Sequence, residues 1–277
     1  MKTIDALNVA KSLLEKNNID TREAKLFLAF ALGVSKEELI KYTQIPDEVY
    51  TKLLVLLEKR CNGIPYAYIV GHKEFMKLDF EVNSSVLIPR DDTEVLVEKV
   101  IEIASNISKN EVKILDLCTG SGCIAISLDK NILNAKVYAS DISKKALEVA
   151  MRNAKKNDAT ITFIESDLFE ELNDNIKFDI IVSNPPYIRT DVIDTLQKEV
   201  KDNEPIIALD GGTDGLSFYE RIIKDAKAYL EDSGYLAFEI GYDQAIEVSN
   251  LLKENNYKNI KVFKDFSEND RVVIANI

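Results

Sequence analysis

The stretch IVSNPPYI, residues 181–188, ends an apolar run in an asparagine, two prolines and a tyrosine. Proline has no backbone N–H and cannot continue a central strand, so the pattern predicts a strand that ends in a stiff turn. The side-chain oxygen of Asn184 and the carbonyl oxygen of Pro185 are two acceptors, and together they suit a planar NH2 group with two donors. Tyr187 can lie flat against the group that carries this nitrogen. The turn therefore indicates chemistry at an amino or amide nitrogen.

A second candidate site is the loop LDLCTGSGCIA, residues 115–125, which also follows an apolar run. Gly120 and Gly122 let the backbone pass close to a ligand and turn into a helix, whose first N–H groups are free to bind it. Residues 120–125 also match the dinucleotide fingerprint G-x-G-x-x-A, so the loop alone leaves a nicotinamide cofactor open.

Three acids narrow this choice, because Asp116, Asp141 and Asp167 each lie at the end of a successive apolar run. An acid at the place of Asp141 can accept both hydroxyls of a ribose, and Asp167 can bond an adenine amino group. Three acids suit S-adenosylmethionine, with its sulfonium and amino groups, better than a pyrophosphate. The alternative is that they only cap helices or turns.

Methyl transfer to a nitrogen fits the turn and the acids together. An amide nitrogen is a poor nucleophile, and two acceptors on its NH2 group return electron density to it. Acceptors that tighten as positive charge grows on nitrogen favour the transition state, and alignment supplies much of the rest. The single histidine, His72, and three cysteines without metal-ligand spacing predict no metal site.

The elements that must position these residues alternate after Pro89 between short apolar strands and helical stretches, which predicts a parallel sheet with helices on both faces. Ligands bind outside the carboxyl ends of such strands, where the strand order reverses. We expect a small helical domain over 1–72, a β-hairpin linker over 73–88 with Asn83-Ser84 as its turn, and the main domain over 89–277.

Composition limits the partners. The chain has 277 residues, is 46% hydrophobic and 30% charged, and carries a net charge of −12. Residues 1–75 hold 11 basic and 10 acidic side chains, so the remaining 24 and 37 leave −13 on the rest of the chain. An acidic main domain argues against nucleic-acid binding, because binding to phosphates relies on clustered basic side chains. No run of ~18 apolar residues predicts a membrane span, and we expect a cytoplasmic protein that acts as a monomer.

The sequence as a whole resembles the HemK/PrmC family, the N5-glutamine methyltransferases of peptide chain release factors. The stretches that carry this resemblance are GIPYAYIVGHKEF (63–75), VLIPRDDTEVLVE (86–98), ILDLCTGSGCIAISL (114–128), SNPPYI (183–188), EPIIALDGGTDGLSFY (204–219) and FEIGYDQ (238–244). The family implies a Rossmann-like class I methyltransferase domain with a mostly parallel seven-stranded sheet, and a helical N-terminal domain that helps to dock the release factor. Its substrate is the glutamine of the Gly-Gly-Gln motif.

The resemblance also implies roles for residues of this chain. We expect the cofactor to contact Asp116, Cys118, Thr119, Gly120, Ser121, Gly122, Asp141, Ile142, Asp167, Leu168 and Asn184. We expect Asn184, Pro185, Pro186 and Tyr187 to hold the glutamine amide, with Asn184, Pro185 and Tyr187 as the catalytic groups, and Arg90 and Glu94 to brace the wall of the site. The chain departs from the family at Cys118, where glycine is usual, at Asp91, where proline is common, and at Met76-Lys77, where an aromatic-glycine pair is frequent.

Other functions use some of the same features. The Asn-Pro-Pro-Tyr box is shared with amino methyltransferases that act on adenine or guanine in nucleic acid. A nicotinamide oxidoreductase and a non-catalytic adaptor with a relic cofactor pocket are the remaining alternatives.

Overall fold

The computed structural model describes residues 1–277, and the chain forms two compact units. The first unit contains residues 1–71 and the short segment 197–203, and the second contains residues 72–196 and 204–277. The hairpin that we expected as a linker is therefore part of the second unit, and a segment from the middle of the expected main domain belongs to the helical unit. No helix combines the length and the apolar character that a membrane span requires.

The first unit is all helical, and an apolar stripe on each of its longer helices forms one core. Its elements are α1 (Thr3–Lys16), α2 (Glu23–Leu32), the 3-10 helix η1 (Glu38–Lys41), α3 (Asp47–Cys61), α4 (Tyr66–Val70) and α9 (Lys198–Lys201). Phe27, Leu28 and Leu53 are fully buried in this core. Gly33 ends α2 in the left-handed conformation, where glycine carries no steric cost.

The second unit is built on a seven-stranded sheet of order β5-β4-β3-β6-β7-β9-β8, in which only β9 runs antiparallel to its neighbours. Its strands are β3 (Val112–Leu117), β4 (Ala135–Asp141), β5 (Ile161–Glu165), β6 (Phe178–Ser183), β7 (Leu230–Glu239), β8 (Lys258–Lys264) and β9 (Asp270–Asn276). Its helices are α5 (Thr93–Ser105), α6 (Cys123–Asn131), α7 (Lys144–Lys156), α8 (Thr190–Ile193), η2 (Ile206–Ala208), α10 (Ser217–Ala226) and α11 (Ala245–Glu254). This arrangement confirms the predicted α/β class with a mostly parallel seven-stranded sheet.

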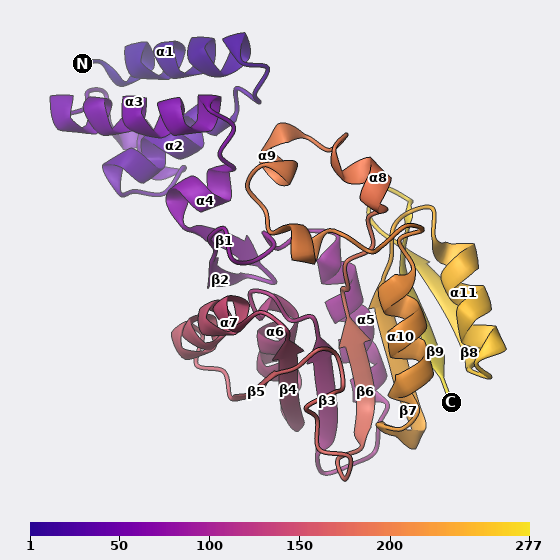
Figure 1. Ribbon diagram of the computed structural model, residues 1–277. Helices are drawn as coiled ribbons and strands as arrows, with labels where there is room; N and C mark the ends of the chain where they lie inside the picture. The colour runs from indigo at the N-terminus through magenta and orange to yellow at the C-terminus, as the bar shows by residue number, and fades with distance from the viewer. The chain divides into compact units, whose positions relative to one another are not determined.

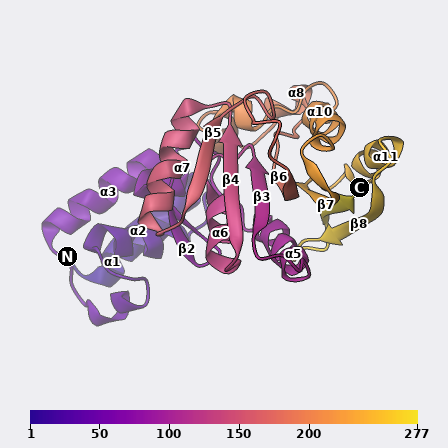
Figure 2. The ribbon, with the colours of Figure 1, turned by 90° about the horizontal axis from the view of Figure 1, so that it is seen from below.

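Helices cover both faces of this sheet, and neighbouring residues of a central strand therefore enter different cores. Ile114 on β3 packs with α5 and α6, whereas Leu115 packs on the opposite face with α10 and α11. Figure 2 shows α10 on one side of the sheet and α6 on the other. Such double burial explains why these strands are apolar runs without polar alternation.

The strand order reverses between β3 and β6, which both run parallel in the middle of the sheet (Figure 1). Consecutive strands leave this point in opposite directions, so the loops after β3 and β6 separate and leave a crevice at their carboxyl ends. The glycine-rich loop follows β3 and the Asn-Pro-Pro-Tyr turn follows β6, and the topology therefore places both at one edge of the sheet.

The hairpin of the second unit pairs β1 (His72–Phe75) with β2 (Leu78–Glu81), and its turn is Met76-Lys77. Asn83-Ser84 does begin a turn, in which the Val86 N–H donates to the Asn83 carbonyl at 3.1 Å. Our expectation that it is the turn of the hairpin was wrong, because these residues follow the second strand. Met76 and Lys77 have φ of 49° and 61°, the pair of positive values that a two-residue type I′ turn requires. Glycine and asparagine favour this turn, so neither residue signals it in the sequence.

The turn gives a first prediction. We expect Lys77→Gly to raise the free energy of unfolding by about 1 kcal/mol, because Lys77 is exposed and holds a left-handed conformation that disfavours a Cβ. Lys77→Ala keeps the Cβ and is the matched control, with no gain expected. Urea unfolding of the three proteins measures the difference, and an equal effect of glycine and alanine would contradict the assignment of strain to residue 77.

Candidate active site

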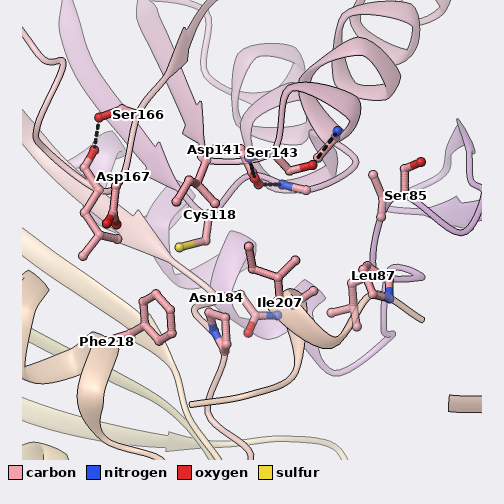
Figure 3. A pocket seen from close by; sticks show the side chains of 18 residues that line it. Ser85, Leu87, Cys118, Asp141, Ser143, Ser166, Asp167, Asn184, Ile207 and Phe218 are labelled. Carbon is pink, nitrogen blue, oxygen red and sulfur yellow. Dashed lines mark hydrogen bonds between the residues drawn. The ribbon is translucent and has the colours of Figure 1, made fainter. Parts of the chain in front are cut away.

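A cavity opens at the carboxyl ends of β3, β4, β5 and β6, and many of the predicted site residues line it (Figure 3). Its predicted members are Cys118, Gly120, Asp141, Ile142, Asp167, Leu168, Asn184 and Pro186. The sequence analysis did not single out its other members, which are Ser85, Val86, Leu87, Ser143, Ala146, Ser166, Pro205, Ile207, Ala208 and Phe218. Segments after four different strands thus converge on one space.

The glycine-rich loop is held against β4 by backbone contacts. The Gly120 N–H donates to Asp141 Oδ2 at 2.8 Å, and the Thr119 N–H donates to the Ser140 carbonyl at 3.0 Å. Gly122 begins α6 with φ of 80°, and a Cβ there would lie 3.1 Å from the Cβ of Ala150. Glycine at this position therefore permits both the turn of the loop and the close packing of α6 on α7.

Asp116 lies beneath this loop and does not line the cavity. Its carboxylate is fully buried, and Oδ2 accepts the Thr119 hydroxyl at 2.6 Å and the Ala125 N–H at 3.2 Å. Oδ1 has no partner, and burial raises the pKa of Asp116 to about 7. Thr119 and Ser121 are buried as well. None of these three predicted cofactor residues lines the cavity: Asp116 supports the loop through its hydrogen bonds, and Thr119 and Ser121 are buried within the loop.

Cys118 occupies the position where glycine is usual in the family, and its φ is 60°. The backbone is therefore left-handed at this position although the residue carries a Cβ. A left-handed conformation costs a residue with a Cβ about 1–2 kcal/mol. Burial raises the pKa of the thiol, so a neutral S–H faces the cavity.

The two acids of the cavity wall have different partners. The carboxylate oxygens of Asp141 accept the N–H groups of Gly120 and Ser143, each at 2.8 Å. Burial raises the pKa of Asp141, and these two hydrogen bonds oppose the rise. Asp167 Oδ1 forms an ion pair with Arg221 Nη2 at 2.9 Å, and this side chain remains partly exposed.

Much of the remaining wall is apolar and includes Ile142, Leu168, Pro205, Ile207, Ala208 and Phe218. An apolar slot beside two carboxylates and a glycine-rich loop matches the parts of S-adenosylmethionine, which combines a flat purine, a diol and two cationic groups. The residues present therefore fit this cofactor.

The Asn-Pro-Pro-Tyr turn begins at Ser183, whose hydroxyl donates to the Leu117 carbonyl at 2.8 Å and ties β6 to β3. Asn184 is half-buried and lines the cavity, where Figure 3 shows it across from Asp167 and Cys118. Its Nδ2 donates to Thr93 Oγ1 at 3.4 Å, and its Oδ1 accepts no hydrogen bond from the protein. An amide oxygen is thus available at the cavity wall.

Tyr187 points away from the cofactor side of the turn. Its ring packs against the core formed with α10 and α11, and its hydroxyl lies 3.3 Å from Glu239 Oε1. It lines a second groove, together with Arg189, Leu216 and Tyr242. Neither Tyr187 nor Pro185 is part of the lining of the first cavity.

The segment ALDGGTDGL, residues 208–216, clamps the chain directly after the turn by backbone hydrogen bonds. The Ile188 N–H donates to the Leu209 carbonyl at 3.0 Å, and the Gly211 N–H donates to the Ile188 carbonyl at 2.8 Å. Gln244 Nε2 donates to the carbonyl oxygens of Tyr187 and Gly215, each at 3.1 Å. Segments far apart in the sequence therefore fix the backbone that presents Asn184.

Comparison with known proteins identifies the family. Residues 5–71 match the PrmC N-terminal domain and residues 92–203 match the methyltransferase small domain. A release factor glutamine methyltransferase of Clostridium botulinum is 41% identical over 98% of this chain and 98% of its own length. One of Fusobacterium nucleatum is 41% identical over 99% of this chain and 78% of its own. The chain belongs to the release factor glutamine methyltransferase family.

The fold agrees with this membership. A methyltransferase structure from Pyrococcus furiosus, 21% identical, has a TM-score of 0.52 and covers 72% of this chain and 88% of its own. Enzymes of this family are S-adenosylmethionine-dependent methyltransferases, so the chain is an enzyme with this cofactor, in agreement with the chemistry of the cavity wall.

Arg90 and Glu94 of this methyltransferase bind other protein groups and do not line the cavity. Arg90 Nη2 lies 2.5 Å from Glu204 Oε1, and the same carboxylate accepts the Ile88 N–H at 3.1 Å. Glu94 accepts the Met76 N–H at 2.6 Å and holds the hairpin turn. Asp91, where the family commonly has proline, is exposed and pairs with Lys73 at 2.6 Å.

Four functional candidates in the structure have no role predicted from the sequence, namely Thr93, Glu204, Glu239 and Gln244. Each lies within a stretch that carried the family resemblance, but none was singled out. A usable signal existed for Glu239, because it ends β7, the strand that pairs with β6 next to the Asn-Pro-Pro-Tyr turn. Reasoning from one strand end to its neighbour requires the strand order, and the sequence does not state that order.

Proposed function

We propose that the enzyme transfers a methyl group from S-adenosylmethionine to the side-chain amide nitrogen, N5, of the glutamine in the Gly-Gly-Gln motif of peptide chain release factors. The near-full-length relatives named as release factor glutamine methyltransferases support this substrate. One observation carries the chemistry: Asn184 faces a cavity rich in cofactor-binding groups with its Oδ1 unpaired.

The cofactor would be held by the loop after β3 and by the two acids of the wall. We assign Cys118, Gly120 and the loop supported by Asp116, Thr119, Ser121 and Gly122 to its methionine part, Asp141 with Ile142 to the ribose, and Asp167 with Leu168 to the adenine. Bound S-adenosylmethionine supplies an electrophilic methyl group on a positively charged sulfur.

The chain itself would orient and activate the amide nitrogen. The Asn184 side-chain oxygen and the Pro185 carbonyl accept no hydrogen bond within the protein, and both can accept from the NH2 group of glutamine. They return electron density to the nitrogen and stabilise the positive charge that grows on it, so they favour the transition state over the ground state. The two prolines keep the turn rigid. Pro186 and Tyr187 form a further part of the wall around the glutamine amide.

The finer assignments are that the enzyme acts as a monomer in the cytoplasm and binds the release factor without contacting nucleic acid. The acidic main domain supports a protein substrate.

Incubation of the protein with a release factor and methyl-labelled S-adenosylmethionine tests the function. We expect label on the Gly-Gly-Gln glutamine and none on a release factor in which this glutamine is alanine. DNA and RNA are supplied in parallel reactions, since label there would favour the nucleic-acid alternative. Cofactor binding without transfer to any release factor would contradict the proposal.

A further inference from the structure

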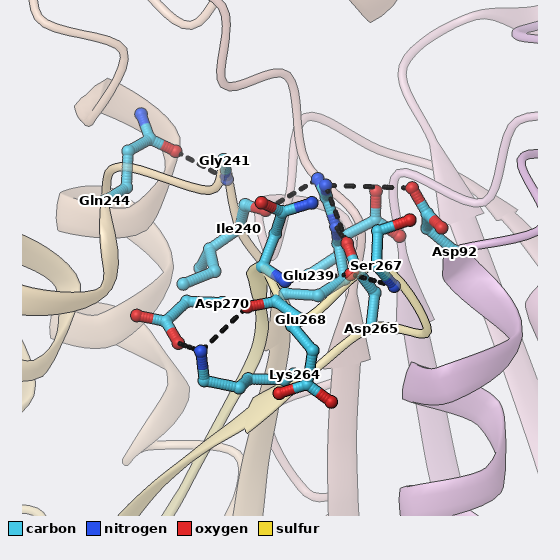
Figure 4. A network of polar contacts seen from close by, with 12 residues as sticks. Asp92, Glu239, Ile240, Gly241, Gln244, Lys264, Asp265, Ser267, Glu268 and Asp270 are labelled. Atoms are coloured by element: carbon cyan, nitrogen blue, oxygen red, sulfur yellow. Dashed lines mark hydrogen bonds and ion pairs between the residues drawn. The ribbon is translucent and has the colours of Figure 1, made fainter.

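Two arginines of the second unit pair with carboxylates near the candidate active site, and only one of these pairs reaches the cavity wall. Arg271 on β9 forms an ion pair with Asp265 at 3.1 Å and lies 3.7 Å from Asp92 (Figure 4), and neither acid lines the cavity. Arg221 on α10 forms an ion pair with Asp167 at 2.9 Å, and Asp167 does line the cavity. Arg221 is not part of the lining, so it meets the cavity only through this acid.

The backbone around Asp167 is held by contacts that do not involve Arg221. Ser166, which is 4% exposed, donates its hydroxyl to the Leu168 carbonyl at 2.9 Å (Figure 3) and accepts the Glu171 N–H at 3.0 Å. The Glu170 N–H donates to the Asp167 carbonyl at 3.2 Å. Leu168 has φ of 53°, a conformation that a bulky side chain keeps only where the surrounding structure determines it. The freedom that remains at Asp167 is therefore rotation of its side chain.

The helix that carries Arg221 is firmly anchored beside the cavity. Its residues Tyr219, Ile222 and Ile223 are fully buried against the sheet. Phe218, three residues before Arg221, lines the cavity (Figure 3), and residues three apart share one face of a helix. The face of α10 that contributes to the cavity wall thus also holds the guanidinium that pairs with Asp167.

Local sequence does not dictate this pair. Asp225 follows Arg221 by four residues on the same helix, a spacing at which opposite charges often pair, and Glu170 lines the same outer groove as Arg221. The ion pair is nevertheless with Asp167. The side chains of Arg221 and Asp167 are 44% and 32% exposed, and an ion pair at such exposure adds little to stability. Its effect is therefore on the orientation of the carboxylate and not on the fold.

A carboxylate of fixed orientation can distinguish two purines that a mobile one accepts equally. The 6-amino group of adenine donates hydrogen bonds, and a carboxylate oxygen accepts them. Hypoxanthine, the deaminated base, has a carbonyl oxygen at this position and carries its donor on the neighbouring ring nitrogen. The Asp167 oxygen that Arg221 leaves free would oppose that carbonyl, acceptor against acceptor, whereas a carboxylate free to rotate could turn to the ring N–H. Fixing the acid therefore builds selection against the wrong base.

We propose that Arg221 is a positioning residue, which acts through Asp167 and makes the cofactor site selective for a purine with a 6-amino group over its deaminated form. This inference rests on the proposed function, because it takes Asp167 as the partner of the adenine. It adds a residue outside the cavity lining that determines which base the lining accepts.

Calorimetric titration of the full-length protein with two ligands tests this role. S-adenosylhomocysteine and S-inosylhomocysteine differ only at position 6 of the purine and its neighbouring ring nitrogen. We expect the wild type to bind the adenine compound about 10–100-fold more tightly, because the deaminated base leaves a charged acceptor unpaired. Arg221→Met, which keeps a long side chain without the charge, should lower this ratio below about fivefold, mainly through weaker binding of the adenine compound.

Lys224→Met is the matched control for the loss of a positive charge. Lys224 lies one turn after Arg221 on α10 and lines the same outer groove, but it forms no ion pair with Asp167. We expect it to keep the wild-type ratio of the two dissociation constants. An equal fall of the ratio in Lys224→Met and Arg221→Met would mean that charge near the cavity sets the selection, and it would overturn the positioning role.

A double variant shows whether Arg221 acts through Asp167. If it does, Arg221→Met/Asp167→Asn should have the same ratio of dissociation constants as Asp167→Asn alone, because the same connection is broken twice. Losses of selectivity that multiply would mean that the two residues act independently, and the proposal would fail.

Two readouts separate positioning from a general structural role. Thermal melts without ligand should place Arg221→Met within about 2 °C of the wild type, since the exposed ion pair adds little to stability. Damage to the fold would weaken both ligands by the same factor and leave their ratio unchanged. An unchanged ratio in Arg221→Met therefore contradicts the inference, whatever the absolute affinities are.

The outcomes also distinguish this inference from the proposed function. A wild-type protein with the expected ratio that methylates no release factor contradicts the function and supports the role of Arg221. A wild-type protein that methylates a release factor but binds the two ligands within about threefold of each other contradicts only the base selection.

Discussion

Asn184→Ala is expected to lower kcat for release factor methylation by about 10²–10³-fold, with the dissociation constant of S-adenosylmethionine within about threefold of wild type. The change removes an acceptor that the structure leaves unpaired at the cavity wall. That acceptor matters most when positive charge develops on the substrate nitrogen, so its loss affects the chemical step more than it affects binding. Calorimetric titration of the cofactor and a steady-state assay of methyl transfer measure the two quantities separately.

Asn184→Asp is the informative companion of this variant. Aspartate keeps acceptors at the cavity wall but cannot donate to Thr93, and it adds a carboxylate to a cavity that already holds Asp141 and Asp167. We therefore expect Asn184→Asp to have a lower kcat than wild type. This loss should vary more with pH than the loss in the alanine variant. If Asn184→Ala lost cofactor binding in parallel with kcat, Asn184 would be a structural support of the cavity and not a group that engages the substrate.

Much of the fold follows from local patterns in the sequence. The apolar runs after Pro89 are strands buried on both faces, and this burial is what removes polar alternation from Val112–Leu117 and Phe178–Ser183. The same patterns place the glycine-rich loop and the Asn-Pro-Pro-Tyr turn at strand ends. The crevice could therefore be predicted before any coordinates were known.

The depth of a residue at a strand end could not be predicted in the same way. Asp116 and Asp141 both lie at the carboxyl ends of strands, yet Asp116 is fully buried beneath the loop and Asp141 lines the cavity. Asp116 belongs to the central strand β3, and its carboxylate turns toward α6, where it accepts the Ala125 N–H. A sequence gives the order of such residues, but the packing of the next helix decides which of them face the ligand.

Backbone conformation was the second feature that could not be predicted from the sequence. Met76, Lys77 and Cys118 all have positive φ, although none is glycine, asparagine or aspartate. Tertiary contacts accompany two of these conformations: Glu94 accepts the Met76 N–H, and Asp141 accepts the N–H of Gly120, two residues after Cys118. Local propensity argues against each of them, so no reading of local residues would have placed the hairpin turn correctly.

Gly211→Ala is expected to destabilise the second unit by about 3 kcal/mol and to abolish most of the activity, because a Cβ there would lie 2.7 Å from the Cα of Tyr187 and 2.8 Å from the Pro186 carbonyl oxygen. Both contacts are with backbone, which cannot move aside as the end of a flexible side chain would. Any relief must displace the Asn-Pro-Pro-Tyr turn itself, so catalysis should suffer even in the fraction that remains folded.

Two further glycines separate steric collision from backbone strain. Gly33→Ala meets open space at φ of 73° and should cost only the left-handed penalty of about 1 kcal/mol, with specific activity unchanged. Gly215→Ala combines backbone strain with steric collision, because φ is 76° and the new Cβ would lie 2.5 Å from the Tyr187 carbonyl oxygen. Thermal melts and specific activities should therefore rank Gly33→Ala as mild and both Gly211→Ala and Gly215→Ala as severe. Equal effects at all three positions would mean that the ALDGGTDGL segment does not clamp the turn.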